Sequence, residues 1–100
     1  MVKHIILWTL KDELSQDEKN DVKAEIKSGL EGLKGKIPGL IDIEVVIDGL
    51  ESSNADLMLD STFESEDALK AYAIHPEHVA VADSRVRPYA KIRSCLDFVK

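Results

Sequence analysis

The sequence of 100 residues predicts an α+β fold whose elements follow the order β-α-β-β-α-β. Three observations support this order. Four segments alternate apolar with polar or small residues, which is the period of a β-strand. Two other segments carry apolar residues at every third or fourth position, which is the period of an amphipathic helix. Each of these two segments begins with a serine followed by acidic residues, a pattern typical of a helix start.

Length and composition favour one small domain spanning residues 1–100. The net charge of −6 argues against nucleic acid and anionic membranes as partners, because both are bound by clustered lysine and arginine. No apolar run reaches the roughly 20 residues that span a bilayer, and the N-terminus shows no signal-peptide cleavage site. The single cysteine, Cys95, excludes an internal disulfide, so we expect a cytoplasmic protein.

The first expected strand runs from Val2 to Leu10 and is apolar on both of its faces. One face carries His4, Ile6 and Trp8, and the other carries Ile5 and Leu7. A strand of this kind is typical of the centre of a sheet that is covered on both sides. The pattern therefore predicts that other parts of the structure pack against both faces of this strand, although it leaves open which face meets the helices.

The first helix is expected to begin at Ser15, because Ser15 and Glu18 have the spacing of a capping box. Gly35 and the pair Pro38-Gly39 should end it. Its apolar stripe, with spacings of three and four residues, consists of Val22, Ile26, Leu30, Leu33 and Ile37.

Residues 41–47 and 55–63 are expected to form a hairpin of two strands joined by the turn-rich segment 48–54. A second helix should begin at Ser65 and break at His75-Pro76, since a residue before proline avoids the helical region. Pro76 can then open a short helix that reaches about Asp83. Residues 89–99 alternate as a last strand.

This order is the ferredoxin-like, split βαβ arrangement, an antiparallel four-stranded sheet with two helices on one face. The other face would be lined by Val46, Met58 and either Ile5 with Leu7 or Ile6 with Trp8. An apolar sheet face without cover needs a partner. We therefore expect a homodimer in which two sheets pack face to face as a dimeric α+β barrel.

Four patches resemble the stress-responsive α/β-barrel domain (Dabb) family: residues 1–8, 33–40, 61–65 and 72–79. The resemblance covers essentially the whole chain and implies a ferredoxin-like protomer whose sheet closes a barrel with that of a partner. Most members of the family have no known reaction. One plant member is a polyketide cyclase that acts by aldol condensation, and its functional positions match His4, Tyr72 and His78. The chain departs from that cyclase at residues 21–26, which lack its bulky aromatic side chains.

The candidate catalytic residues are His78 as general base, Tyr72 as donor to a developing oxyanion, and His4. Trp8 and Val79 would help to line their pocket, between the sheet and the second helix. Such a pocket would bind a small hydrophobic or carbonyl-containing molecule and could serve a cofactor-free cyclase or lyase. In the alternative interpretation the same residues only pack, and the protein is a non-enzymatic stress-response or structural homodimer. No feature of the chain supports a third possibility, a regulatory binding module.

The sequence predicts no metal site and no cofactor. His75 and His78 have a spacing that could suit a metal, but Pro76 interrupts the helix between them, and we expect His75 to close the turn. The acids of the second and third strands are read as a solvated face. Arg93, two residues before Cys95, could lower the pKa of that thiol. There is no phosphate-binding loop, serine triad or nucleotide fingerprint.

Overall fold

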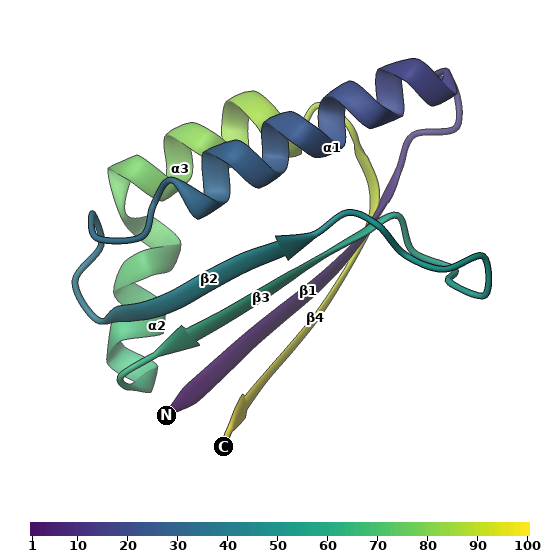
Figure 1. Cartoon of the computed structure of the whole chain (residues 1–100). Helices are drawn as coiled ribbons and strands as arrows, with labels where there is room; N and C mark the ends of the chain where they lie inside the picture. The colour runs from purple at the N-terminus through teal and green to yellow at the C-terminus, as the bar shows by residue number, and fades with distance from the viewer.

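The protein is described by a computed structural model that covers residues 1–100. Its four antiparallel strands follow the spatial order β2-β3-β1-β4, with the helices on one face (Figure 1). The predicted element order and the ferredoxin-like fold are confirmed. In chain order the elements are β1 (Val2–Leu10), α1 (Gln16–Glu31), β2 (Leu40–Val46), β3 (Leu57–Phe63), α2 (Glu66–Ile74), α3 (Pro76–Val81), the π-helical turn η1 (Ala82–Val86) and β4 (Ala90–Val99).

Both predicted helix starts are confirmed. Ser15 Oγ accepts a hydrogen bond from the backbone N–H of Glu18 at 3.1 Å, and the Glu18 carboxylate accepts from the N–H of Ser15 at 3.0 Å. Ser65 Oγ caps α2 by accepting from the N–H of Ala68 at 3.1 Å. These bonds satisfy amides of the first helical turn, which have no partner within the helix.

Helix α1 ends earlier than its apolar stripe. It stops at Glu31, and Gly32 occupies the C-cap position. Leu33 and Ile37 are still buried, but they reach the core from the turns that follow. The physical reason is the glycine content, since Gly32 has poor helical propensity and Gly35 adopts a φ of 85°.

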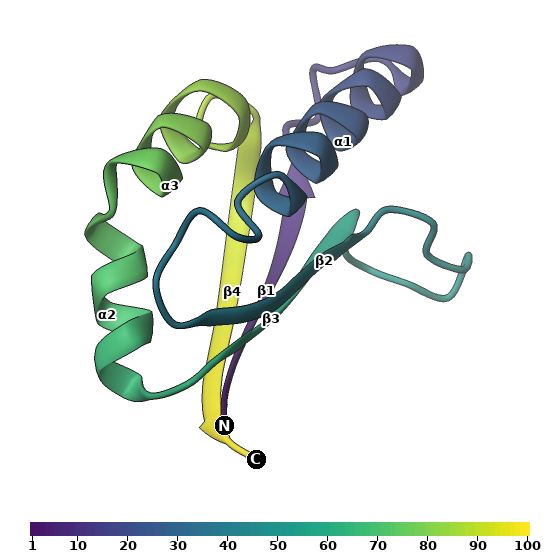
Figure 2. The same ribbon diagram turned by 60° about the vertical axis from the view of Figure 1, so that its left-hand side comes forward.

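The break between α2 and α3 lies at His75, as predicted. His75 is extended, with a φ of −67° and a ψ of 131°, and Pro76 opens α3. The chain then continues through η1, a turn that the sequence pattern did not predict. Figure 2 shows α2 and α3 following one another along one side of the sheet. The N- and C-termini lie close together at the end of the sheet that is nearer to α2.

The helices cover the face of the sheet that carries Ile6 and Trp8, which are 4% exposed each. This placement decides the alternative that the sequence left open. The core of 17 residues lies between this covered face and the helices. Its largest fully buried side chains include Tyr72, Phe63 and Leu10.

The opposite face of the sheet, here called the open face, has no helix above it. It is nevertheless apolar, because Ile5 of β1 pairs with Leu96 of β4, and Leu7 pairs with Met58 of β3. Its exposed large apolar side chains are Leu7, Val46, Ile92, Leu96 and Phe98. None of the helices of this fold is long and apolar enough to cross a membrane.

Candidate functional site

A cavity of about 290 Å³ lies between the covered face, α2, α3 and η1. Its wall is mostly apolar. The structure brings four of the predicted residues to it, namely His4 and Trp8 from β1, Tyr72 from α2 and His78 from α3. Val79, the fifth, does not line the cavity. Successive residues of a helix point about 100° apart, and it is the His78 side of α3 that borders the cavity.

Tyr72 is the most buried polar side chain of the cavity wall, with 1% of its surface exposed. Its hydroxyl has no hydrogen-bond partner within the protein. The ring packs against Phe63, with centroids 4.9 Å apart, and against the ring of His78 at 4.1 Å. Burial raises the pKa of Tyr72 well above its ordinary value, so the phenol stays protonated and can donate a hydrogen bond.

His78 is half-buried, and its Nδ1 lies 3.4 Å from the backbone carbonyl of Ala73. Burial lowers the pKa of His78, and this effect outweighs the opposing effect of the Ala73 carbonyl. The imidazole is therefore mainly neutral near pH 7. An Nδ1–H donated to the Ala73 carbonyl leaves Nε2 with the lone pair, which is the form that a general base requires.

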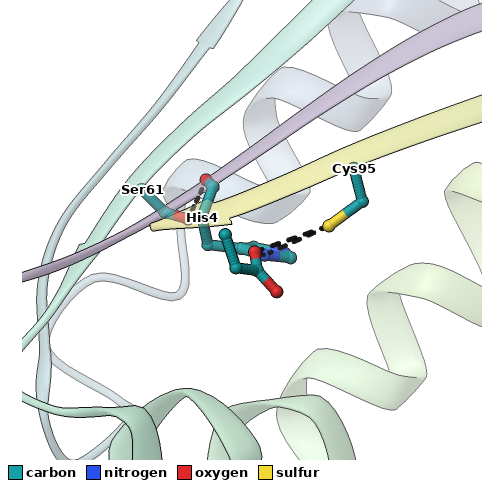
Figure 3. Close-up of polar contacts among 4 residues, drawn as sticks. His4, Ser61 and Cys95 are labelled. Atoms are coloured by element: carbon teal, nitrogen blue, oxygen red, sulfur yellow. Dashed lines mark hydrogen bonds and ion pairs between the residues drawn. The ribbon is translucent and has the colours of Figure 1, made fainter. Parts of the chain in front are cut away.

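His4 is 7% exposed and has a partner that the sequence did not reveal. Its Nδ1 lies 2.5 Å from Oδ1 of Asp97, the residue directly opposite on β4. The backbone carbonyl of His4 accepts a hydrogen bond from Ser61 Oγ at 2.8 Å, as Figure 3 shows. Asp97 is 93 positions from His4 in the chain. Only the pairing of β1 with β4 places the two residues side by side.

Cys95 extends this group of side chains along β4. Its Sγ lies 3.4 Å from Asp97 Oδ1 and 3.8 Å from His4 Nδ1 (Figure 3). Arg93 acts on the pKa of the thiol in the expected direction and lowers it, but it does not decide the net shift. The pKa is raised, because desolvation and the hydrogen bond and negative charge of Asp97 outweigh the effect of Arg93.

His75 lies outside this region and closes the turn, as predicted, by accepting a hydrogen bond from the N–H of Glu77 at 3.1 Å. His75 and His78 do not converge with a third metal-ligating group, and the acids of β2 and β3 do not either. The structure instead gathers His4, Cys95 and Asp97, whose ligand atoms lie within 4.8 Å of one another. The sequence reasoning missed this group, since it joins residues from the two ends of the chain.

A second, more open hollow of about 710 Å³ adjoins the first and lies between β4 and α2. His4, Cys95 and Asp97 all contribute to its wall, together with Glu66 and Lys70 from α2. His4 is shared by both spaces. The histidine therefore lies where the mostly apolar cavity meets a more open hollow that carries several charged side chains.

The whole chain is similar to a described protein family and to several solved structures. Residues 2–100 match the family model of the stress responsive A/B barrel domain. No curated protein matches the sequence. A dimeric protein of unknown function with a ferredoxin-like fold from Bacteroides fragilis is 35% identical, with a TM-score of 0.90, over 97% of this chain and 93% of that one.

Two more distant solved structures share the fold. A dimeric ferredoxin-like protein of unknown function from Thermobifida fusca is 26% identical, with a TM-score of 0.78, over 99% of this chain and 90% of the other. A hydroxynitrile lyase from Passiflora edulis is 19% identical, with a TM-score of 0.71, over 97% of this chain and 90% of the lyase.

Proposed function

The chain belongs to the stress-responsive A/B barrel domain family, and from that premise we propose that it binds a small carbonyl-containing molecule in the cavity beside Tyr72 and His78. The proposed chemistry is that of a cofactor-free cyclase or lyase. A cavity of about 290 Å³ is at the lower end of the range for small-molecule sites, which favours a compact, single-ring or short-chain ligand.

The observation that carries this proposal is the Tyr72 hydroxyl, which is buried and lacks a hydrogen-bond partner. A buried hydroxyl without a partner costs about 1–3 kcal/mol. A purely structural tyrosine could be replaced by phenylalanine without that cost. A ligand carbonyl in the cavity would accept the missing hydrogen bond, and its oxygen would then be held by a neutral donor in an apolar environment.

His78 would act as the general base toward a carbonyl compound that is bound in this way. Nε2 would take a proton from the carbon next to the carbonyl group, and the electron pair of the broken C–H bond would move to the carbonyl oxygen. Tyr72 would stabilise the resulting enolate. In a cyclisation the enolate carbon then attacks a second carbonyl of the same molecule, whose oxygen regains the proton. In a lyase reaction the base instead takes a hydroxyl proton, the oxygen electron pair forms a carbonyl, and the adjacent carbon–carbon bond breaks. The departing carbon keeps the electron pair of that bond and takes the proton back from His78.

The Passiflora edulis hydroxynitrile lyase supports the proposal only at the level of the fold. The sequence gives more specific support, because His4, Tyr72 and His78 are the positions that resemble the functional residues of the family cyclase. His4 would be a positioning residue at the rear of the cavity, held by Asp97. Its place beside the ring of Tyr72, with centroids 6.1 Å apart, limits how that ring can turn.

A second candidate function is a non-enzymatic homodimer, and the open face favours it. A large exposed apolar sheet surface needs cover in a soluble protein. The solved relatives from Bacteroides fragilis and Thermobifida fusca are described as dimeric. We propose that two open faces pack together, which leaves the cavity of each protomer on the outer side of the dimer. Homodimerisation is therefore compatible with either function.

The test is a thermal-shift screen of aromatic and β-keto compounds against the wild type, His78→Gln and His75→Gln. His75→Gln is the matched control, because this histidine lies three residues from His78, at the break between α2 and α3, and outside the cavity. A compound that stabilises the wild type and the control, but not His78→Gln, supports the proposed site. If a broad panel yields no binder, the structural homodimer is the better interpretation.

A further inference from the structure

Three different kinds of metal-ligating group meet on the helix side of strands β1 and β4. They are the imidazole of His4, the thiol of Cys95 and the carboxylate of Asp97. His4 lies directly opposite Asp97 in the antiparallel pairing, and Cys95 is the next residue of β4 on the same face. Ligands on paired strands are held by the sheet itself, so their separation is set by regular backbone geometry.

Two of the three distances between the ligand atoms are near those around a tetrahedral ion. Metal–ligand bonds of about 2.0–2.3 Å require ligand atoms about 3.3–3.6 Å apart. Cys95 Sγ lies 3.4 Å from Asp97 Oδ1 and 3.8 Å from His4 Nδ1. The separation of His4 Nδ1 from Asp97 Oδ1, at 2.5 Å, is a short hydrogen bond that would have to open. The Asp97 side chain is 45% exposed and is free to move outward by this amount.

Asp97 Oδ1 is the point on which the group converges, since it faces both the imidazole nitrogen and the thiol. An ion would replace the hydrogen bonds at this centre. Binding would convert the Cys95 thiol to a thiolate and release its proton to solvent. The proton that His4 Nδ1 shares with Asp97 would leave Nδ1, and a neutral imidazole protonated at Nε2 would then offer its Nδ1 lone pair to the ion.

We propose that His4, Cys95 and Asp97 bind one divalent transition-metal ion of the zinc class. Sulfur and nitrogen ligands select zinc, cobalt or nickel over magnesium and calcium, which prefer oxygen. Three protein ligands leave a fourth position free, which is the arrangement of zinc sites that bind water or substrate. That position would face the hollow of about 710 Å³ between β4 and α2.

Two positively charged side chains in the wall of the hollow oppose the ion, Arg93 from β4 and Lys70 from α2. Arg93 precedes Cys95 by two residues on the same face of β4 and contributes to the wall of the hollow. Its positive charge acts on the Cys95 thiol. The same charge repels a dication, so the site binds less tightly than its ligands alone would allow. Glu66, on the facing helix α2, partly compensates.

The site does not depend on the carbonyl chemistry proposed above. Its free position faces the more open hollow, whereas Tyr72 and His78 line the first cavity, and only the His4 ligand belongs to both walls. Cys95 and Asp97 also lie on the opposite side of the sheet from the open face. Dimerisation through that face leaves both ligands accessible.

The experiment is a titration of the reduced full-length chain with Co²⁺, followed by absorption spectroscopy and by competition with Zn²⁺. We expect one ion per chain, a thiolate-to-cobalt charge-transfer band, and visible bands of four-coordinate intensity that Zn²⁺ abolishes. Cys95→Ser should remove the charge-transfer band. Asp97→Asn should weaken binding by about 10-fold or more. Arg93→Gln should tighten it.

His75→Gln serves as the matched control, since His75 is the accessible histidine outside the site, and it should titrate like the wild type. Cys95 and Asp97 are exposed, so their variants are expected to fold, and circular dichroism checks this. Absence of a charge-transfer band in the wild type overturns the proposal. Binding that is equally tight in Cys95→Ser and Asp97→Asn overturns it as well, because the ion would then lie elsewhere.

Discussion

The two faces of the sheet are built from the same four strands, yet they meet different surroundings. On the covered face, Phe63 is fully buried against Tyr72 and the helices. On the open face, Phe98 is 40% exposed and has no helix above it. These are the only two phenylalanines of the chain. The comparison teaches that one face stabilises the protomer and forms the cavity, whereas the other is apolar without serving the protomer's own core.

A charge placed on the open face is the strongest test of whether this face is covered by a second protomer. Leu96 is 64% exposed in the protomer and lies at the centre of β4. In a symmetric dimer both copies would be buried, and burial of a leucine contributes about 1.5–3 kcal/mol per copy. Leu96→Asp should therefore weaken dimerisation by about 3–6 kcal/mol. Light scattering should report a folded monomer at micromolar concentration. A wild type that is itself monomeric would contradict the proposed dimer.

A truncation on each face separates protomer stability from assembly. Phe63→Ala should lower the free energy of unfolding by about 3–5 kcal/mol, because it leaves a cavity in a closed core. Phe98→Ala removes the same atoms from a site that is open in the protomer, so it should cost less than about 1 kcal/mol in dilute, monomeric samples. Urea denaturation measures both values. Equal costs at low protein concentration would show that the two faces do not differ as described.

Substitution of Tyr72 tests whether a binding site on the covered face lowers the stability of the unliganded protein. Tyr72→Phe removes a buried hydroxyl that has no partner. We expect the unliganded protein to gain about 1–3 kcal/mol, while any ligand found by the screen loses affinity. Thermal unfolding with and without that ligand measures the two effects. A variant that is less stable than the wild type would mean that the hydroxyl already has a partner, such as a bound water.

His78 gives the smallest expected effect, on the pH dependence of stability. Its pKa in the folded protein is below the ordinary value of 6.5, mainly because of burial. The unfolded chain therefore binds the proton more readily, and stability is lost as the pH falls through about 6.5 toward the folded pKa. The contribution is at most about 1.4 kcal/mol per pH unit, since a single histidine takes up no more than one proton. Chemical denaturation between about pH 5 and 8 measures this effect. The free energy of unfolding of His78→Gln should depend less on pH than that of His75→Gln.

The candidate site was only partly predictable. Tyr72 and His78 lie within one short segment, and the kink at His75-Pro76 that turns both toward the cavity follows from the properties of proline. Val79 does not line the cavity although α3 begins at Pro76 as predicted, because the packing of α3 on the sheet turns the His78 side toward the cavity. Asp97 carried no local signal, since an acid in an alternating strand is usually solvated. The lowering effect of Arg93 on the pKa of Cys95 could be expected from their spacing, but the larger opposing effects of burial and of Asp97 could not.

The sequence by itself determined the order of the elements, the helix starts at Ser15 and Ser65, and the break at His75-Pro76. These features depend on neighbours a few residues apart, whose hydrogen bonds and dihedral angles are local. Only the tertiary structure decided which face of β1 meets the helices and which residues stand beside His4. Both depend on strand pairing, which joins the first residues of the chain to the last. The grouping of His4 with Cys95 and Asp97 follows from that pairing alone.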